Sequence, residues 1–359
     1  MVRRIILAGG GTAGHIEPAL AVADSLRKME PELELEFLGT ASGLERLLVP
    51  QRGYVLRTIP KVAMPRKLSP GALLFPFRLI GSVFKARRII KGSDLLIGFG
   101  GYVSAPAYLA AAITRTPIVI HEANAKPGWA NRVGAGFTQH LAVAHPVEQG
   151  SFSKALLAGL PLRSDVAQGC TESAADWSKA RSAAKSRLGF STNAPLVVIM
   201  GGSQGSVAIN SVITDSVSTF NNKGISVLHS VGKLNALPIA TGGYKPVAYI
   251  DAMADAYLAA DLIIARSGAV TCSEFRALGR YALFVPLPIG NGEQFVNAAS
   301  LVATNRAQVI TQKEFTAQYI STNIASLLEK ASHAPIAGDP QDLRAAEKIV
   351  ALAEFAMNS

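Results

Sequence analysis

Short apolar runs alternate with amphipathic segments along the first part of the chain. The predicted strands lie at 4–8, 33–38, 55–59, 94–97 and 118–121. The predicted helices lie at 18–29, 44–52, 81–91 and 105–114. Strands separated by helices in this order predict a parallel sheet with right-handed crossovers.

The alternation pauses at Pro161 and then resumes. Residues 164–195 are rich in Ser, Ala and Thr, with a helix predicted at 174–188. The second cycle has predicted strands at 196–200, 226–230, 247–250, 262–265 and 282–285, and predicted helices at 207–220, 253–260 and 269–278. Because 359 residues exceed one typical core, two domains are expected.

The expected fold class is α/β, with two Rossmann-like doubly wound domains that face each other across a cleft. The N-terminal domain is predicted at 1–162 and the C-terminal domain at 163–340. The last helix, within 341–359, is predicted to pack back on the N-terminal domain.

Three predicted strands run directly into glycine-rich segments. These are GGGTAGH at 9–15, GFGGY at 98–102 and GGSQG at 201–205. Glycine adopts unusual dihedral angles and has no Cβ to block a ligand, so such loops present bare backbone N–H groups to a phosphate. Their spread over both domains predicts that the protein binds a nucleotide and a second ligand.

The first loop has the GxGxxG spacing of dinucleotide-binding proteins, at Gly9, Gly11 and Gly14. That class also needs an acidic residue at the end of the second strand to hold the ribose. Here the second strand ends in FLGT at 37–40, without a carboxylate. The sequence therefore disfavours NAD or FAD, and no cofactor is expected.

His15 is the histidine best placed for chemistry, on the first turn of a helix at the edge of a phosphate-type loop. Imidazole titrates near neutral pH, so it can accept a proton from an attacking hydroxyl. The alternative is a histidine that binds the loop or a ligand phosphate and takes no proton, and the sequence favours neither. Glu17 is a weaker base candidate, since it can simply complement the positive end of the helix.

Polar side chains also follow strands at the carboxyl edges of both predicted sheets. HEAN at 121–124 lies where ligands bind in such sheets, and Asn124 is the favoured ligand contact. Glu293, Gln294 and Asn297 carry amide and carboxylate groups that suit sugar hydroxyls. A polar loop without a ligand is the alternative for this second group.

RSGAVTCSE at 266–274 follows a predicted strand and opens a helix. SG at 267–268 can bind an anion at the helix N-terminus, and Glu274 can accept hydrogen bonds from two ribose hydroxyls. The alternative is a capping box in which Thr271 is the cap and the glutamate follows three residues later. That alternative does not explain Arg266.

The chain contains no DxD motif, so its sequence gives no support for a divalent metal on a diphosphate, and no metal is expected. The charge of a leaving diphosphate would then be met by backbone N–H groups, helix N-termini and cationic side chains such as Arg163. Cys170 and Cys272 form no CxxC pair, which disfavours a zinc site or a disulfide framework.

The formal net charge is +10, and one stretch carries much of the imbalance. Residues 61–92 hold eight basic residues and no acidic ones, interleaved with Leu and Phe. This mixture is typical of contact with an anionic membrane surface rather than with nucleic acid. The alternative is an amphipathic helix that packs its apolar face inward. The predicted contact residues are Leu73, Leu74, Phe75, Phe77 and Arg78.

The longest uncharged stretch, 95–114, is nominally long enough to span a bilayer. Three glycines, a serine and a proline interrupt it, so a strand, a loop and a helix are predicted there instead. No transmembrane helix is expected.

Six ordered segments resemble those of the MurG family of bacterial transferases, over nearly the whole chain. They are GGGTAGH at 9–15, GFGGYVS at 98–104, HEAN at 121–124, GGSQG at 201–205, RSGAVTCSE at 266–274 and EQFVN at 293–297. The resemblance implies the GT-B fold and an inverting hexosyltransferase that needs no tightly bound metal. The implied reaction moves GlcNAc from UDP-GlcNAc to the C4 hydroxyl of MurNAc in undecaprenyl-diphospho-MurNAc-pentapeptide, in peptidoglycan synthesis. It also implies a peripheral protein on the cytoplasmic face of the cell membrane, with other cell-wall synthesis and division proteins as further partners.

Site residues carry over from the family where the motifs match. His15 matches the family histidine discussed as catalytic or diphosphate-binding. The positions that match UDP-GlcNAc contacts are Thr12, Ala13, Gly14, Asn124, Arg163, Ser203, Ile250, Ala269, Val270, Thr271, Ser273, Glu274 and Gln294. The positions expected to meet the acceptor diphosphate are Gly100, Gly101 and Tyr102, and the segment around 73–84 matches the membrane patch of the family. Some members carry other residues at Ala13, Ala123 and Glu293, and none of these departures removes a role.

Two other classes of protein fit parts of the sequence. One is another GT-B transferase that uses a UDP-sugar and a lipid acceptor, such as a glycolipid-forming enzyme. The other is a non-catalytic UDP-sugar-binding protein of a cell-wall complex. His15, Asn124 and Glu274 together weigh against the non-catalytic class.

Overall fold

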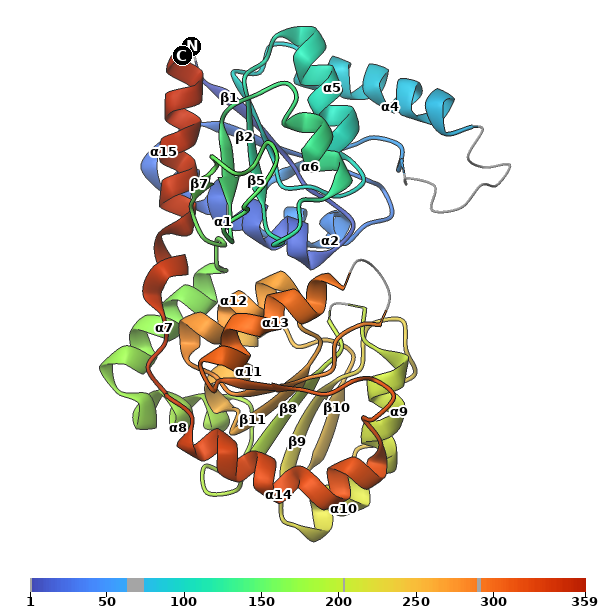
Figure 1. Cartoon of the computed structure of the whole chain (residues 1–359), viewed down its shortest axis with the longest axis vertical. Helices are drawn as coiled ribbons and strands as arrows, with labels where there is room; N and C mark the ends of the chain where they lie inside the picture. The colour runs from blue at the N-terminus through green and yellow to red at the C-terminus, as the bar shows by residue number, and fades with distance from the viewer. Residues whose placement is uncertain (1, 63–73, 203, 289–291) are drawn as a thin grey trace. The chain divides into compact units, whose positions relative to one another are not determined.

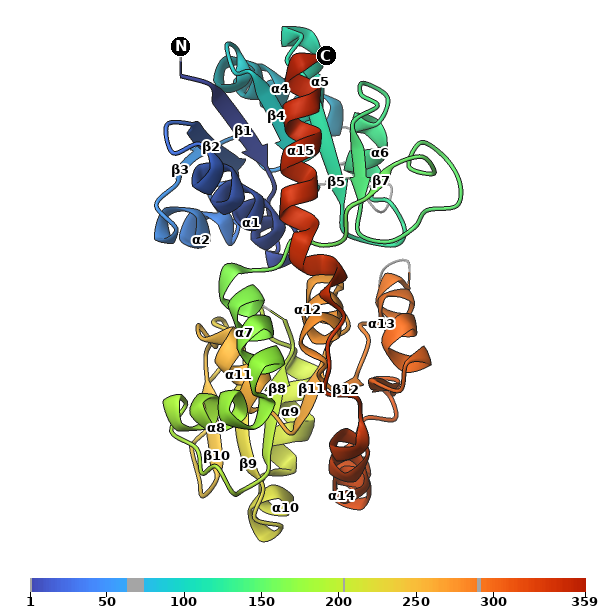
Figure 2. The same cartoon turned by 90° about the vertical axis from the view of Figure 1, so that its left-hand side faces the viewer.

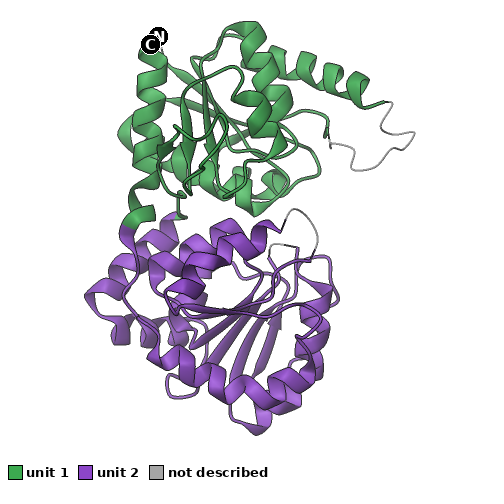
Figure 3. Ribbon diagram, viewed as in Figure 1, with its two compact units in different colours: residues 1–163, 341–359 green, residues 164–340 purple. Residues whose placement is uncertain are grey.

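The computed structural model describes residues 2–62, 74–202, 204–288 and 292–359. They form two compact units, the first of residues 1–163 with 341–359 and the second of residues 164–340 (Figure 3). Each unit has its own parallel sheet and its own helices (Figure 1).

The first unit contains a seven-stranded sheet in the order β3-β2-β1-β4-β5-β6-β7, with every pair parallel. Its strands are β1 (Arg4–Ala8), β2 (Glu34–Gly39), β3 (Val55–Thr58), β4 (Leu95–Gly98), β5 (Ile118–Glu122), β6 (Leu141–Val143) and β7 (Leu156–Leu157). Its helices are α1 (Ala13–Met29), α2 (Glu45–Gln51), α4 (Phe75–Ile90), α5 (Ser104–Thr114), α6 (Trp129–Gly134) and α15 (Ala345–Asn358), which follows a short 3₁₀ segment (Pro340–Arg344).

Apolar side chains cover both faces of this sheet. In β1, Ile5 and Leu7 pack with residues of α1 and α15, whereas Ile6 and Ala8 pack with residues of α4 and α5. A strand covered on both faces is apolar throughout, which explains why residues 5–8 show no alternation. Figure 2 shows α15 lying along the sheet beside α1, and the two helices are in contact.

The second unit contains a six-stranded parallel sheet in the order β10-β9-β8-β11-β12-β13. Its strands are β8 (Leu196–Met200), β9 (Ser226–Ser230), β10 (Tyr244–Val247), β11 (Leu262–Ala265), β12 (Ala282–Phe284) and β13 (Ala307–Val309). Its helices are α7 (Ser164–Ala175), α8 (Trp177–Arg187), α9 (Val207–Asp215), α10 (Val217–Asn222), α11 (Met253–Ala259), α12 (Ala269–Leu278), α13 (Glu293–Ala303) and α14 (Ala317–His333).

Several helix bounds differ from those predicted. The helix predicted at 207–220 is two helices, α9 and α10, which meet at Ser216; its hydroxyl donates to the carbonyl of Val212. The helix predicted at 174–188 begins at Trp177, because the Asp176 side chain caps it by accepting the Lys179 N–H at 3.0 Å. α7 was not predicted at all.

Both sheets reverse their winding direction at one place. In the first unit β2 and β3 lie on one side of β1, and β4 to β7 lie on the other. In the second unit β9 and β10 lie on one side of β8, and β11 to β13 lie on the other. Ligands of doubly wound proteins bind at the carboxyl ends of the strands at such switch points. The loops that follow β1 and β4, and those that follow β8 and β11, are therefore the candidate sites.

Candidate functional site

In the first unit the two glycine loops at the switch point pack directly against each other. A Cβ on Gly101 would overlap the carbonyl of Gly10, so only glycine fits there. Gly100 and Gly101 both have positive φ, at 90° and 88°. Within the described residues, neither of their N–H groups has a hydrogen-bond partner. The second loop therefore offers open N–H donors next to the N-terminus of α5.

His15 lies on the first turn of α1, beside this second loop. Its Nδ1 is 3.1 Å from the hydroxyl of Thr12, and a Cβ on Gly100 would lie 3.3 Å from its Nε2. Burial lowers the pKa of His15, although the charge of Glu122, a backbone hydrogen bond at Gly10 and the charge of Glu45 oppose this. The ring is therefore mainly neutral at pH 7 and able to accept a proton.

HEAN at 121–124 forms the end of β5 and the turn after it. Buried Glu122 accepts the N–H of Asn124 at 2.9 Å, its side-chain amide at 3.1 Å and the amide of Asn131 at 2.9 Å. His121 is also buried, with its Nε2 2.8 Å from the carbonyl of Gly159, and burial lowers its pKa. Only Asn124 is partly exposed among these three polar residues of the motif, and Glu122 fixes its position.

Glu17 and Arg163 face each other in the first unit. The Arg163 Nη1 lies 4.0 Å from the Glu17 Oε1, and both side chains are largely buried. The Glu17 carboxylate is therefore paired with an arginine of the same unit.

A carboxylate that the sequence did not predict lies beneath the first glycine loop. Glu45, on α2, accepts the N–H of Gly11 at 3.0 Å and the N–H of Thr40 at 2.8 Å. The expectation that the first loop presents bare N–H groups is therefore wrong at Gly11. β2 ends without a carboxylate, and the next one along the chain is Glu45 on the following helix. Its hydrogen bonds go to the protein's own loop and leave the ribose of a dinucleotide without this contact.

In the second unit Arg266 lies under the glycine loop that follows β8. Its guanidinium donates to the carbonyls of Val285 and Pro286 at 2.8 and 3.0 Å, to the Ser206 hydroxyl at 2.8 Å and to the Gln312 side chain at 2.7 Å. Burial lowers its pKa, and within the described residues it forms no ion pair. All four acceptors are neutral, so its positive charge remains available to an anion bound at these loops.

The helix after β11 begins at Ala269, with Gly268 as its N-cap residue. The capping-box alternative is therefore wrong, because Thr271 lies inside α12 and does not cap it. Glu274 is buried, and its Oε2 accepts the hydroxyl of Tyr257 at 2.7 Å. Tyr257, on α11, is a neighbour that the sequence did not identify.

The remaining predicted donor residues of this unit lie around the same strand ends. Ile250, Ala269 and Ser273 are buried, and Val270 and Thr271 are partly exposed. Gln294 accepts the Leu287 N–H at 2.9 Å and so fixes the loop after β12. Ser203 lies outside the described residues.

The predicted membrane segment is largely helix α4, and Leu73 lies outside the described residues. Buried Ser82, Ala86 and Ile90 form its inward face, whereas Phe77 and Phe84 are 73% and 60% exposed. Phe75 packs edge-on against Trp129, and Leu74 and Arg78 are exposed. The inward-packing alternative thus accounts for one face of α4 only.

The outward face continues into a groove of about 460 Å³ between α4 and α5. Its lining is Leu79, Ile80, Val83, Phe84, Arg87, Leu109 and Ile113. In the described parts of the chain, no helix combines the length and the apolar character that a membrane span requires.

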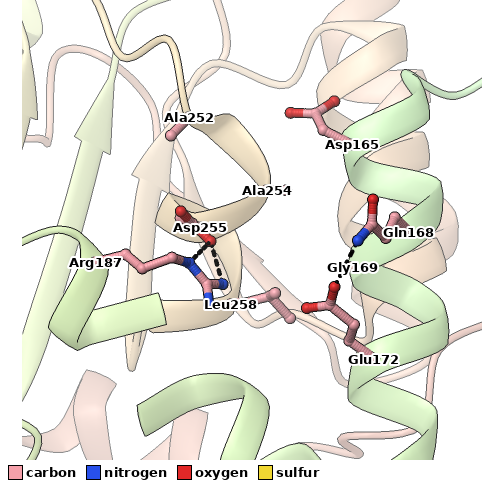
Figure 4. A pocket seen from close by; sticks show the side chains of 9 residues that line it. All are labelled: Asp165, Gln168, Gly169, Glu172, Arg187, Ala252, Ala254, Asp255 and Leu258. Atoms are coloured by element: carbon pink, nitrogen blue, oxygen red, sulfur yellow. Dashed lines mark hydrogen bonds and ion pairs between the residues drawn. The ribbon is translucent and has the colours of Figure 1, made fainter. Parts of the chain in front are cut away.

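A separate pocket of about 320 Å³ lies in the second unit among α7, α8 and α11 (Figure 4). Arg187 and Asp255 form an ion pair at 2.9 Å, and Gln168 donates to Glu172 at 2.9 Å. No residue of the predicted site lines this pocket, so it is not part of the candidate site.

Both cysteines are buried as free thiols, and burial raises the pKa of Cys170 to about 12. Among the residues that the structure places, no three His, Cys, Asp or Glu side chains gather as metal ligands.

Two doubly wound units, each with glycine loops at its switch point, are the architecture of the GT-B glycosyltransferases. The N-terminal domain of glycosyltransferase family 28 matches residues 5–143, and the C-terminal domain of that family matches residues 196–351. The chain belongs to this family and, within it, to the MurG N-acetylglucosamine transferases. The predicted family and fold class are thereby confirmed.

Two curated relatives support this assignment. Both are named UDP-N-acetylglucosamine--N-acetylmuramyl-(pentapeptide) pyrophosphoryl-undecaprenol N-acetylglucosamine transferase. The protein from Thermobifida fusca is 45% identical, over 90% of this chain and 86% of the relative. The protein from Streptomyces coelicolor is 42% identical, over 90% of this chain and 89% of the relative.

Solved structures show the same architecture. The crystal structure of MurG from Acinetobacter baumannii is similar with a TM-score of 0.68 and 25% identity, over 98% of this chain and 99% of that one. The UDP-GlcNAc 2-epimerase from Neisseria meningitidis has a TM-score of 0.61 at 13% identity, over 99% of this chain and 100% of that one. This second likeness concerns the fold alone.

Proposed function

We propose that this protein transfers GlcNAc from UDP-GlcNAc to the C4 hydroxyl of MurNAc in undecaprenyl-diphospho-MurNAc-pentapeptide, with inversion at the sugar C1. The observation that carries the proposal is the 45% identity, over 90% of the chain, to a relative named for GlcNAc transfer to this lipid. The reaction belongs to peptidoglycan synthesis.

The donor is proposed to bind mainly through the second unit. Glu274 holds the ribose hydroxyls, the backbone at Ile250 reads uracil, and the N–H groups of Ala269 and Val270 hold the diphosphate. The N-terminus of α12 and the buried charge of Arg266 support an anion at this place. The further donor contacts proposed are Ser203, Thr271, Ser273 and Gln294 from the second unit, with Thr12, Ala13, Gly14, Asn124 and Arg163 from the first unit.

The acceptor is proposed to bind at the first unit. Its diphosphate meets the open N–H groups of Gly100 and Gly101 and the following residue, Tyr102. His15 accepts the proton of the MurNAc C4 hydroxyl while the oxygen forms its bond to the sugar C1. The bond from C1 to the UDP oxygen breaks at the same time, and UDP leaves with the electron pair.

The Tyr257 hydroxyl is expected to hold Glu274 in place for the ribose. Removing it in Tyr257→Phe takes away one hydrogen bond to a charged group, so the Kd for UDP should rise about tenfold. Calorimetry with UDP measures this. Tyr244→Phe is the matched control, because the Tyr244 hydroxyl contacts His229 in the same unit and should leave UDP binding unchanged. If the two variants bind UDP with the same Kd, Tyr257 does not hold Glu274 in place for the ribose.

The outward face of α4 is proposed to contact anionic lipid, and the proposed location is the cytoplasmic face of the cell membrane. Phe77 and Phe84 are exposed on a helix that also carries Arg78, Lys85 and Arg87. Other proteins of cell-wall synthesis and division are further proposed partners.

Replacing both aromatics, in Phe77→Ser with Phe84→Ser, should weaken binding to anionic vesicles about a hundredfold, since burying each ring contributes roughly 1.5 kcal/mol or more. Vesicle sedimentation measures the effect. Phe355→Ser is the control, because Phe355 is 64% exposed on α15, outside this face. Undiminished vesicle binding by the double variant would exclude α4 as the contact.

Acceptor choice tests the proposed function against its two rivals. UDP release should require a short-chain analogue of the muramyl lipid and should not occur with diacylglycerol. Release with diacylglycerol indicates a glycolipid-forming transferase. UDP-GlcNAc binding without release on any acceptor indicates a non-catalytic protein.

A further inference from the structure

Glu45 is a buried carboxylate to which the proposed function assigns no part. It lies on the first turn of α2 and has no exposed surface. One oxygen accepts the Gly11 N–H at 3.0 Å, and the other accepts the N–H and the hydroxyl of Thr40 at 2.8 and 2.7 Å. A carboxylate held by three donors is fixed in orientation.

Three glycines make room for this side chain. A Cβ on Gly10 would lie 2.8 Å from the Glu45 Oε1, and one on Gly39 would lie 2.5 Å from its Cγ. A Cβ on Gly43 would overlap the carboxylate itself. The first glycine loop and the turn after β2 are thus shaped around Glu45 as well as around any ligand.

The anchored residue, Gly11, is joined to His15 by a short local path. Gly11 precedes Thr12, whose carbonyl accepts the His15 N–H at 3.1 Å and whose hydroxyl lies 3.1 Å from the His15 Nδ1. The other edge of the ring lies against Gly100. A shift of the turn at Gly11 would therefore move the imidazole relative to the second glycine loop.

The charges that act on His15 come from two elements, Glu45 on α2 and Glu122 at the end of β5. The neutral neighbours are Asn131, near Gly100, and Tyr102, whose ring has the ammonium of Lys61 4.3 Å from its centroid. Both carboxylates favour the protonated imidazole, against the effect of burial on the His15 pKa.

We infer that Glu45 is a positioning residue for the transfer reaction, because its carboxylate anchors the turn at Gly11 and thereby holds His15 at the second glycine loop. It touches neither substrate and acts through the loop and through its charge. The inference rests on the proposed role of His15 as the base.

Glu45→Gln tests the inference with little change in volume. The amide brings N–H donors to a place where every partner is a donor, so the turn loosens and the negative charge is lost. We expect kcat to fall about tenfold or more, since small misplacements of a reacting group have effects of this size. The KM for UDP-GlcNAc should change less than kcat, because most of the proposed donor contacts lie in the second unit.

The pH dependence of kcat distinguishes the proposed role from a general structural defect, because a general defect would not shift the pKa of His15. Without the charge of Glu45 the imidazolium is less stable, so the His15 pKa falls. The acidic limb of the kcat profile, where the base becomes protonated, should therefore move to lower pH. NMR titration of the His15 ring, assigned with a His15→Asn variant, measures the same shift without substrate.

Two further variants complete the design. Glu36→Gln removes another buried carboxylate of the same unit, which pairs with Arg4 and Arg57, and it should leave kcat and the His15 pKa unchanged. Gly43→Ala pushes the Glu45 carboxylate aside without removing it, and it should lower kcat even if Glu45→Gln does not fold.

An unchanged kcat and an unchanged His15 pKa in folded Glu45→Gln, or an unchanged kcat in Gly43→Ala, overturns the inference. These results are distinct from a failure of the proposed function. If His15→Ala keeps full activity, the proposed base is wrong. If His15→Ala is inactive while Glu45→Gln is fully active, only the role of Glu45 is lost.

Discussion

His15→Ala is expected to lower kcat by about 10²- to 10⁴-fold, the usual contribution of a positioned general base. Burial keeps the ring mainly neutral, and its place beside Gly100 and Gly101 puts it next to the proposed acceptor diphosphate. The C4 hydroxyl that it would deprotonate is a poor nucleophile unless its proton is removed as the new bond forms. Rates measured at saturating concentrations of both substrates give this number directly.

The Kd for UDP-GlcNAc separates the two roles that remain open for His15. A base contributes in the transition state, so the alanine variant should bind the donor almost as the parent protein does. His333→Ala is a suitable control, because this ring lies at the end of α14 and contacts the carbonyl of Glu329. If His15→Ala weakens only acceptor binding and leaves kcat intact, His15 is a diphosphate ligand and not a base.

Glu274→Gln is expected to raise the KM for UDP-GlcNAc about 10- to 100-fold, because hydrogen bonds to a charged group contribute roughly 1.5–3 kcal/mol. The amide has nearly the shape of the carboxylate and can still accept the Tyr257 hydroxyl, so the fold of the second unit is kept. The loss therefore reports on the ribose contact.

Comparison of UDP with 2′-deoxy-UDP makes this test specific. The parent protein should prefer the ribonucleotide, and Glu274→Gln should bind the two with similar Kd values. Glu172→Gln, in the separate pocket of the second unit, should keep the preference. A variant at Glu274 that still discriminates between the two nucleotides would show that another group reads the ribose.

Much of the fold could be predicted from local pattern. β1, β4, β8 and β11 are apolar runs buried on both faces, and the loops after β1, β4 and β8 contain glycines that the packing requires. The helix α7 was missed because only Val166, Gly169 and Cys170 are buried in it, too few apolar residues for a clear helical period.

The site was only partly predictable, because its supporting contacts are long-range. His15, Asn124 and Glu274 stand in recognisable motifs next to strand ends, and Glu122, which fixes Asn124, belongs to the same motif. The groups that hold His15 and Glu274 are distant in the sequence: Glu45 accepts from a loop 34 residues earlier, and Tyr257 lies 17 residues before Glu274. The glycines at 39 and 43 are the sequence feature that accompanies Glu45, since a Cβ at either position would meet its side chain. This contact can be recognised only once the fold of the turn is known.

The central claim is that GlcNAc moves to the muramyl lipid at a site where backbone N–H groups and cationic side chains, without a metal ion, neutralise the leaving diphosphate. The most direct test is to incubate the protein with UDP-GlcNAc and a short-chain muramyl-pentapeptide lipid in buffer containing EDTA, and to measure UDP and glycosylated lipid together. Equal amounts of both products, formed at the full rate, are expected. No glycosylated lipid, or a reaction that only added Mg²⁺ restores, would contradict it.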